Sequence, residues 1–319
     1  MSIEEWLSVR GVDKDVAGLV TVLSTCVREV GDILANSPVG HVGTQNAFGD
    51  AQLSVDVLGD EKIFQLLTDS RLVRMAASEE QPELRLLSPE GKFTVCFDPV
   101  DGSSIVDCNW AVGSLFAVWG GEGVVGKCGR DQVLSAMAVY GPRTTLIVAI
   151  AEIDQVFELT LVRSQWVVTA ERLVLDGQRV KIFSPANLRS ANDLPSYQSL
   201  LCDWQSRKLT LRYTGGLVPD IAGLLVKGGG IFCSPVSPSA PAKLRLVFEC
   251  LAVGLIVELA EGAAFDGDGN CLLDVRIQGT DQRAGLVAGS REEVDRVVRV
   301  LERRGCNDLE EEAAMVANG

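Results

Sequence analysis

The chain has 319 residues with a hydrophobic fraction of 47%, which is enough to bury one large core or two without disulfide bonds. Its formal net charge of -14 disfavours nucleic acid and anionic lipid as partners, and no apolar run approaches the length of a bilayer span. Nine irregularly spaced cysteines and a single histidine make a zinc site improbable. The first residues are acidic where a targeting leader would be basic, so we expect a cytoplasmic protein.

Hydrophobic periodicity divides the chain into elements. It predicts helices at residues 16–34 and 57–67, with a polar, glycine-rich loop at 40–46 between them. The β-prone run 93–97 predicts a strand that stops at Asp98 and leads into a loop. Further strands are predicted at 114–119, 133–140, 145–149, 156–162 and 165–169. Beyond a boundary near residue 178, helices are predicted at 221–226 and 244–259, and strands at 209–213 and 286–288.

The loop after the strand at 93–97 reads Asp-Pro-Val-Asp-Gly-Ser-Ser over residues 98–104. The carboxylates of Asp98 and Asp101 and the carbonyl of Val100 could converge on one hard cation in a turn stiffened by proline. Such a cation would also attract an anionic ligand to a protein of negative net charge. A solvent-exposed turn is the plain alternative for the shorter pieces of this string, because Asp-Pro and Asp-Gly are common in turns.

The second half of the string has features of a phosphate site. Gly102 lets the backbone approach a ligand closely, and the amides of Ser103 and Ser104 could donate to phosphate oxygens. The segment could therefore hold a metal and a phosphoryl group together.

Other acidic residues could complete the site. Glu249 lies in an apolar run, where a carboxylate needs a partner such as a cation. The pair Glu79 and Glu80 could be an exposed acidic loop, and Asp50 and Asp56 could be surface or helix-capping residues. Each has an ordinary structural interpretation, so their order along the chain carries the argument.

The ordered motifs resemble those of the fructose-1,6-bisphosphatase family, within the inositol-monophosphatase-like phosphatases. They lie at residues 49–56, 78–80, 98–104, 212–213 and 243–245, and the resemblance covers nearly the whole chain. It implies an α/β (α+β) fold, a layered α-β-α-β-α sandwich of two subdomains with mixed sheets. We expect residues 1–178 to form the metal-binding domain and residues 179–319 the sugar-phosphate-binding domain.

The resemblance also implies a set of site residues. Two or three magnesium ions, which manganese could replace, would be bound by Glu79, Glu80, Asp98, the carbonyl of Val100, Asp101 and Glu249. Asp56 with Glu80 would activate the attacking water, and Asp50 would sit beside the metals. The substrate would be bound by Asp101, Gly102, Ser103, Ser104, Asn187, Arg189, Arg212, Tyr213, Lys243 and Arg245.

The sequence at residues 2–7, 140–145, 183–189 and 212–216 resembles the corresponding sequences of the family branch that acts on sedoheptulose 1,7-bisphosphate. This branch implies hydrolysis of the 1-phosphate by a homodimer or homotetramer. Arg189 and Ser234 stand where fructose-1,6-bisphosphatases carry tyrosines, and Ala186 stands where they carry an asparagine, which could leave room for a longer sugar.

Two other functions stay open. One is hydrolysis of fructose 1,6-bisphosphate, alone or as a second activity. The other is a catalytically silent metabolite-binding protein of the same fold, against which the intact acidic set argues, because buried carboxylates are costly without a metal.

Overall fold

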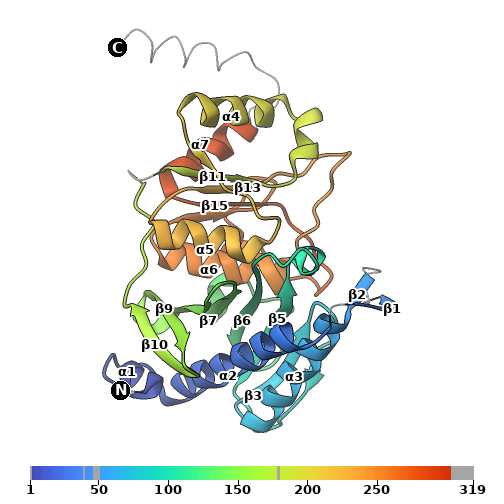
Figure 1. Ribbon diagram of the computed structural model, residues 1–319. Coiled ribbons are helices and arrows are strands. Elements are labelled where there is room, and N and C mark those ends of the chain that lie inside the picture. The colour runs from blue at the N-terminus through green and yellow to red at the C-terminus, as the bar shows by residue number, and fades with distance from the viewer. Residues whose placement is uncertain (1, 39, 46–50, 178–179, 303–319) are drawn as a thin grey trace.

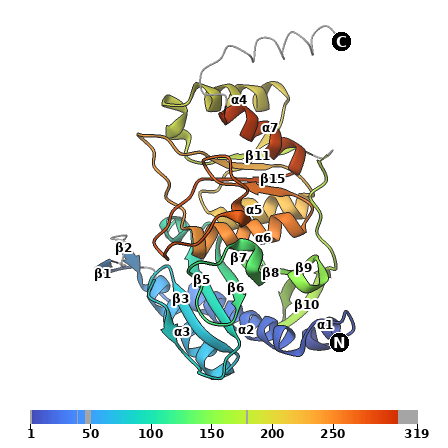
Figure 2. The ribbon, with the colours of Figure 1, turned by 180° about the vertical axis from the view of Figure 1, so that it is seen from behind.

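The computed structural model describes residues 2–38, 40–45, 51–177 and 180–302. The chain forms five stacked layers, with two sheets separated by one pair of helices and flanked by others (Figures 1 and 2). This arrangement confirms the layered α-β-α-β-α sandwich with mixed sheets that the resemblance implied. None of the helices in the described part of the chain is long and apolar enough to cross a membrane.

The first sheet has eight strands in the order β10-β9-β8-β7-β6-β5-β3-β4, all antiparallel except for the parallel pair β3 and β5. Its strands are β3 (Val73–Ser78), β4 (Arg85–Leu86), β5 (Phe93–Asp101), β6 (Val112–Gly120), β7 (Gln132–Tyr140), β8 (Thr144–Ile150), β9 (Gln155–Val162) and β10 (Gln165–Ala170). Its outer face is covered by α1 (Ile3–Ser8), α2 (Lys14–Asn36) and α3 (Ser54–Ser70). The carboxylate of Asp13 accepts hydrogen bonds from the first amides of α2 and so begins this helix.

The second sheet has five strands in the order β12-β11-β13-β15-β14. They are β11 (Ile182–Pro185), β12 (Thr210–Leu211), β13 (Ile231–Ser234), β14 (Ala263–Phe265) and β15 (Leu286–Gly289). Helices α5 (Leu217–Lys227) and α6 (Leu251–Leu259) lie between the two sheets, and α4 (Pro195–Ser206) and α7 (Arg291–Glu302) cover the outer face (Figure 1).

Three hydrophobic cores fill the spaces between the five layers. Adjacent residues of one strand belong to different cores, because successive side chains of a strand point to opposite faces of the sheet. Leu115 of β6 faces the core between the sheets, while Phe116 faces the core under α2 and α3. Both faces of the first sheet are therefore buried at its central strands, from β5 to β8, which explains their nearly continuous apolar runs.

Three sequence predictions need correction. The predicted loop at 40–46 is instead largely a strand, β1 (His41–Gln45), which pairs with β2 (Ala51–Leu53). Strand β5 does not stop at Asp98 but continues to Asp101, because an irregularity in its pairing with β6 accommodates the turn within the strand. The helix predicted from residue 244 begins at Leu246 with a wide π-type turn, Leu246–Cys250, before α6.

The predicted division of the chain at residue 178 falls on residues 178–179, outside the described part, and stays a prediction.

Candidate active site

Three carboxylates meet between the sheets. Glu79 directly follows β3, and Asp98 lies on the neighbouring parallel strand β5. The amide of Glu79 donates to the carbonyl of Phe97 at 3.0 Å, so the two strands place Glu79 and Asp98 side by side. Glu249 reaches them from the π-type turn before α6, and one oxygen of each carboxylate lies within 4.8 Å of the others. The structure thus brings together three of the six predicted metal ligands.

The π-type turn sets the position of Glu249. The amides of Glu249 and Cys250 both donate to the carbonyl of Arg245 at 3.1 Å, and the carboxylate of Glu249 accepts from the amide of Arg245. Such wide turns are frequent at functional sites because they displace one side chain from the regular helical register. Arg245 is only 2% exposed, and its Nη2 lies 3.6 Å from Oε1 of Glu79. The positively charged guanidinium of Arg245 therefore lies buried beside the carboxylates.

The segment around Val100 is fixed by hydrogen bonds to buried groups. The amide of Val100 donates to Oδ1 of Asp98 at 3.0 Å. The hydroxyl of Ser114 donates to the carbonyl of Pro99 at 2.6 Å and lies 2.8 Å from the hydroxyl of Tyr140. Gly102 follows in the left-handed region with φ 85°, which glycine adopts without strain. The chain can therefore turn sharply into the short helical turn Ser103–Ile105.

Burial raises the pKa values of the three carboxyls, and repulsion by neighbouring carboxylates adds to the rise. Burial raises the pKa of Glu79 to about 7, although Arg245 opposes the rise. The pKa values of Asp98 and Glu249 lie well above their ordinary range, because both groups are buried and each is repelled by Glu79. Three hard oxygen ligands that repel one another in a buried site fit a divalent cation, which would compensate their charge.

Asp56 lies in the first turn of α3, next to the Glu79–Glu80 pair. Its Oδ2 accepts from the amide of Leu53 at 2.9 Å, and its Oδ1 is buried with no hydrogen-bond partner among the described residues. Burial raises the pKa of Asp56 to about 7, and repulsion by Glu80 and Glu79 adds to the rise. The structure therefore brings Asp56 and Glu80 close enough for their charges to interact, whereas Asp50 lies outside the described residues.

Asp101 contacts a different partner from the other carboxylates. Its two oxygens accept hydrogen bonds from the amides of Leu217, at 3.2 Å, and Val218, at 2.7 Å, at the start of α5. Burial raises its pKa to about 6, while these two amides oppose the rise. In this structure Asp101 thus caps α5 and is not one of the three carboxylates that lie within 4.8 Å of one another, although its charge repels all three.

A cavity of about 470 Å³ opens beside the motif and is lined by both halves of the chain. Its lining includes the predicted substrate residues Asp101, Ser104, Asn187, Arg189, Tyr213 and Lys243, and the small side chains of Ala186 and Ser234. Four of the predicted substrate residues, Gly102, Ser103, Arg212 and Arg245, do not line it; Arg212 is exposed and Arg245 is buried beside Glu79. The Asn187 amide donates to the carbonyls of Pro235, at 2.7 Å, and Ala240, at 3.1 Å, so it supports the wall of the cavity.

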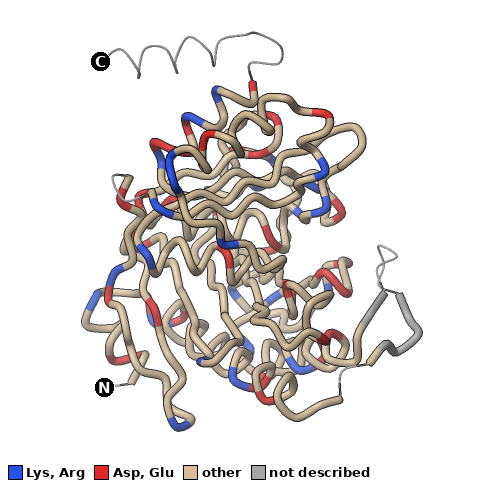
Figure 3. Tube along the Cα trace, turned by 45° about the horizontal axis from the view of Figure 1, so that its top comes forward, with Lys and Arg blue, Asp and Glu red and all other residues tan. Residues whose placement is uncertain are grey.

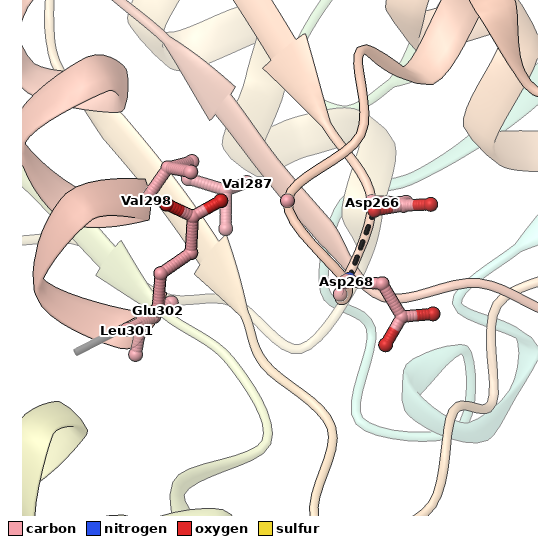
Figure 4. Close-up of a pocket in the computed structure, with 8 residues that line it drawn as sticks. Asp266, Asp268, Val287, Val298, Leu301 and Glu302 are labelled. Atoms are coloured by element: carbon pink, nitrogen blue, oxygen red, sulfur yellow. Dashed lines mark hydrogen bonds between the residues drawn. The ribbon is translucent and has the colours of Figure 1, made fainter. Parts of the chain in front are cut away.

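A second, smaller cavity of about 220 Å³ lies between the loop of residues 266–270 and the end of α7 (Figure 4). Its carboxylates belong to Asp266, Asp268 and Glu302. Oδ1 of Asp266 accepts from the amides of Asp268, at 2.9 Å, and Asn270, at 2.8 Å, so this side chain closes its own loop. None of the predicted site residues lines this cavity.

The sequence interpretation missed two buried aspartates near the site. Asp60 lies one helical turn after Asp56, a spacing that could have revealed it. Asp220 lies in the first turn of α5 and accepts from the amide of Thr214 at 3.0 and 3.2 Å. It thereby fixes the loop that carries Arg212 and Tyr213, a role that depends on a turn the sequence does not show.

An acidic centre that fits a cation, beside a cavity that carries Arg189 and Lys243, offers charges complementary to those of a phosphorylated ligand. Acidic and basic residues occur in both halves of the described chain (Figure 3). Because the net charge is -14, the side chains of Arg189 and Lys243 must attract an anionic ligand locally.

Comparisons with known proteins define the class. The family model for the N-terminal domain of fructose-1,6-bisphosphatase matches residues 3–171, and that for its C-terminal domain matches residues 177–302. The chain therefore belongs to the fructose-1,6-bisphosphatase family and is a sugar bisphosphatase, an enzyme that hydrolyses phosphate esters.

Individual relatives come from both branches of this family. The chain is 39% identical over 313 residues to chloroplastic sedoheptulose-1,7-bisphosphatase of Spinacia oleracea, covering 97% of this chain and 80% of the relative. It is 33% identical over 301 residues to class 1 fructose-1,6-bisphosphatase of Trichlorobacter lovleyi, covering 92% and 93%. A crystal structure from Toxoplasma gondii, provisionally assigned as a sedoheptulose-1,7 bisphosphatase, superposes with a TM-score of 0.88 at 38% identity, covering 94% and 98%.

Proposed function

We propose that the chain hydrolyses the 1-phosphate of sedoheptulose 1,7-bisphosphate with magnesium, giving sedoheptulose 7-phosphate and inorganic phosphate. One observation carries this proposal: a single cavity is lined by Asp101 and Ser104 of the motif and by Arg189, Tyr213 and Lys243 of the second half. Such a cavity offers contacts for a sugar with a phosphate at each end. The higher identity to the sedoheptulose enzyme, 39% against 33%, favours the longer sugar.

Glu79, Asp98 and Glu249 would hold the magnesium, with Glu80, Asp101 and the carbonyl of Val100 as further ligands, and manganese would substitute. The bound cations would neutralise the charge of the phosphoryl oxygens. Two or three ions per site would balance this number of carboxylates.

The chain's own residues would do the rest of the chemistry. The buried guanidinium of Arg245 and the amides of Ser103 and Ser104 would orient the 1-phosphate. Asp56 and Glu80 would take the proton of the attacking water as its oxygen bonds to phosphorus. The bond between phosphorus and the sugar oxygen would then break, and the leaving oxygen would take a proton from a solvent water, while the proton held by Asp56 and Glu80 would return to solvent. Asp50 would support this group from beside the metals.

The distal phosphate would be bound at the other end of the cavity. Arg189, Tyr213 and Lys243 line the cavity together with Ala186 and Ser234, which present little bulk. Arg189 and Tyr213 would hold the distal phosphate, and Lys243 would contact the sugar or the 1-phosphate. Arg212 is exposed beside Leu211 and Tyr213, which are 60% and 44% exposed. We propose a homodimer or homotetramer in which Arg212 serves the site of a neighbouring subunit.

The division of labour between the two halves of the chain is part of the same proposal. Residues 1–178 would supply most of the metal ligands, and residues 179–319 would supply Glu249 and most of the contacts with the sugar.

Fructose 1,6-bisphosphate is the second candidate substrate, because relatives from both branches match nearly the whole chain. One carbon changes transition-state binding by about 1–3 kcal/mol, which is roughly 10–200-fold in specificity. We therefore expect measurable activity on the shorter sugar.

The experiment that tests the substrate compares kcat/KM for the two bisphosphates, side by side, at saturating magnesium. The proposal expects a higher value for the heptulose. A higher value for fructose 1,6-bisphosphate would overturn the substrate and leave the reaction class intact.

A further inference from the structure

Asp60 is a buried carboxylate that the proposed reaction does not use. It lies on α3 one turn after Asp56 and is only 2% exposed. It does not line the cavity and is not among the three clustered carboxylates. Its Oδ2 accepts a hydrogen bond from Nε2 of Gln81, and the Ser78 side chain of the same turn also interacts with this carboxyl. Oδ1 of Asp60 makes no hydrogen bond of normal geometry to the described residues. Because burying such a group is costly, its position calls for an explanation.

Gln81 closes the turn that presents Glu79 and Glu80. The amide of Ser78 donates to the carbonyl of Gln81 at 3.0 Å, and the amide of Gln81 donates to the hydroxyl of Ser78 at 2.9 Å. The amide of Glu79 ties one side of the turn to β5. The side chain of Gln81 ties the other side to α3 through Asp60.

The orientation of the Gln81 side chain is fixed by a third residue. Nη1 of Arg85 donates to Oε1 of Gln81 at 2.8 Å, and the guanidinium of Arg85 lies 4.7 Å from the centre of the Phe64 ring. The oxygen of the Gln81 amide therefore faces Arg85 and its nitrogen faces Asp60. Arg85, Gln81 and Asp60 form one chain of hydrogen bonds that ends on the helix carrying Asp56.

We propose that Asp60 is a positioning residue: as the acceptor for Gln81, it holds the Glu79–Glu80 turn against α3 and so sets Glu80 beside Asp56. This inference rests on the proposed function, which assigns Glu80 and Asp56 to the attacking water. Outer residues that orient a site in this way typically change activity by 10–100-fold when they are lost.

If Gln81 needs a hydrogen-bond acceptor at residue 60 and not a negative charge, two substitutions of Asp60 should have different effects. Asp60→Leu removes the acceptor, whereas Asp60→Asn can turn its Oδ1 toward Gln81 and place its amide nitrogen where Oδ1 of Asp60 has no partner. We expect Asp60→Leu to lower kcat by about 10–100-fold and to raise the magnesium concentration for half-maximal rate, with KM nearly unchanged. Asp60→Asn should stay near wild type. Asp69→Asn, at an exposed position of the same helix, is the matched control.

Gln81→Met removes the same hydrogen bond from the other side at a partly exposed position, and it carries the test if Asp60→Leu does not fold. Its loss of kcat should match that of Asp60→Leu, and the double variant should lose no more than either single one. Unchanged kcat and magnesium dependence in folded Asp60→Leu or Gln81→Met would overturn the proposal. So would an Asp60→Asn variant as impaired as Asp60→Leu, because the charge would then matter rather than the hydrogen bond.

Magnesium-dependent phosphate release by the wild type tests the proposed function separately. The kcat of each variant relative to the kcat of the wild type, measured on whichever bisphosphate is hydrolysed, tests the role of Asp60.

Discussion

The carboxylate of Asp101 accepts a hydrogen bond from the amide of Val218 at 2.7 Å. This bond joins the last residue of β5, in the first sheet, to the start of α5, in the layer between the sheets. Asp101 therefore links the motif to the segment that forms one wall of the cavity.

Replacing Asp101 with alanine should affect stability as well as activity. The two amides of α5 would lose their acceptor, which typically costs about 1–2 kcal/mol for a helix cap. Urea unfolding measures the free energy, and the phosphate-release assay measures the activity. Asp107→Ala, at an exposed position of the same loop, is the matched control. An Asp101→Ala variant as stable as the control would show that the contact with α5 contributes nothing to stability.

Activity should require a divalent cation. Chelation should abolish phosphate release, and magnesium or manganese should restore it, because the site offers only hard oxygen ligands. Asp98→Asn and Glu79→Gln should each lower kcat by more than about 100-fold, beyond the 10–100-fold typical of residues that only support ligands. Full turnover in excess chelator would contradict the metal assignment.

Ser234→Tyr should shift the preference toward the shorter sugar. The cavity wall at Ser234 is small, and an aromatic ring there would shorten the space for the distal phosphate. We expect the ratio of kcat/KM for the heptulose to that for the hexose to fall by roughly 10-fold or more, within the range for one carbon. The magnesium dependence should not change. An unaltered ratio would show that Ser234 does not determine which sugar length the enzyme prefers.

Glu293 should make the protein sensitive to acid. Burial raises its pKa, but hydrogen bonds from Arg207, Arg296 and Trp204 outweigh this and lower it to about 2. Because the folded-state pKa lies below the ordinary value of 4.5, the stabilisation is complete above about pH 5 and is lost as the pH falls toward 2. The ionised Glu293 stabilises the folded state by about 3 kcal/mol at most.

Glu293→Gln should therefore lower the melting temperature at pH 7 and flatten its decline between pH 5 and pH 3. Glu292→Gln, its exposed neighbour on α7, should behave like the wild type. A pH profile of Glu293→Gln that parallels the wild type would contradict the low pKa.

Much of the first sheet could be predicted from the sequence, since strands buried on both faces leave long apolar runs such as Val133 to Tyr140. The strand β1 could not, because His41–Gln45 is mostly polar and contains Gly43, and only its pairing with β2 makes it a strand.

The site was predictable in its types of residue but not in its contacts. Glu79 and Asp98 approach because β3 and β5 are parallel neighbours, and Glu249 joins them through a π-type turn that no local pattern reveals. The amides that bind Asp101 lie more than 100 residues further along the chain. Contacts of this kind depend on how the layers pack, which a local pattern does not contain.

The most direct test of the central claim is to follow sedoheptulose 1,7-bisphosphate by phosphorus NMR with wild-type enzyme and magnesium, with Asp98→Asn as the control. We predict that inorganic phosphate and sedoheptulose 7-phosphate appear in equal amounts with the wild type, and that neither appears at a comparable rate with the variant. Intact substrate with the wild type, or loss of the 7-phosphate in place of the 1-phosphate, would contradict the account.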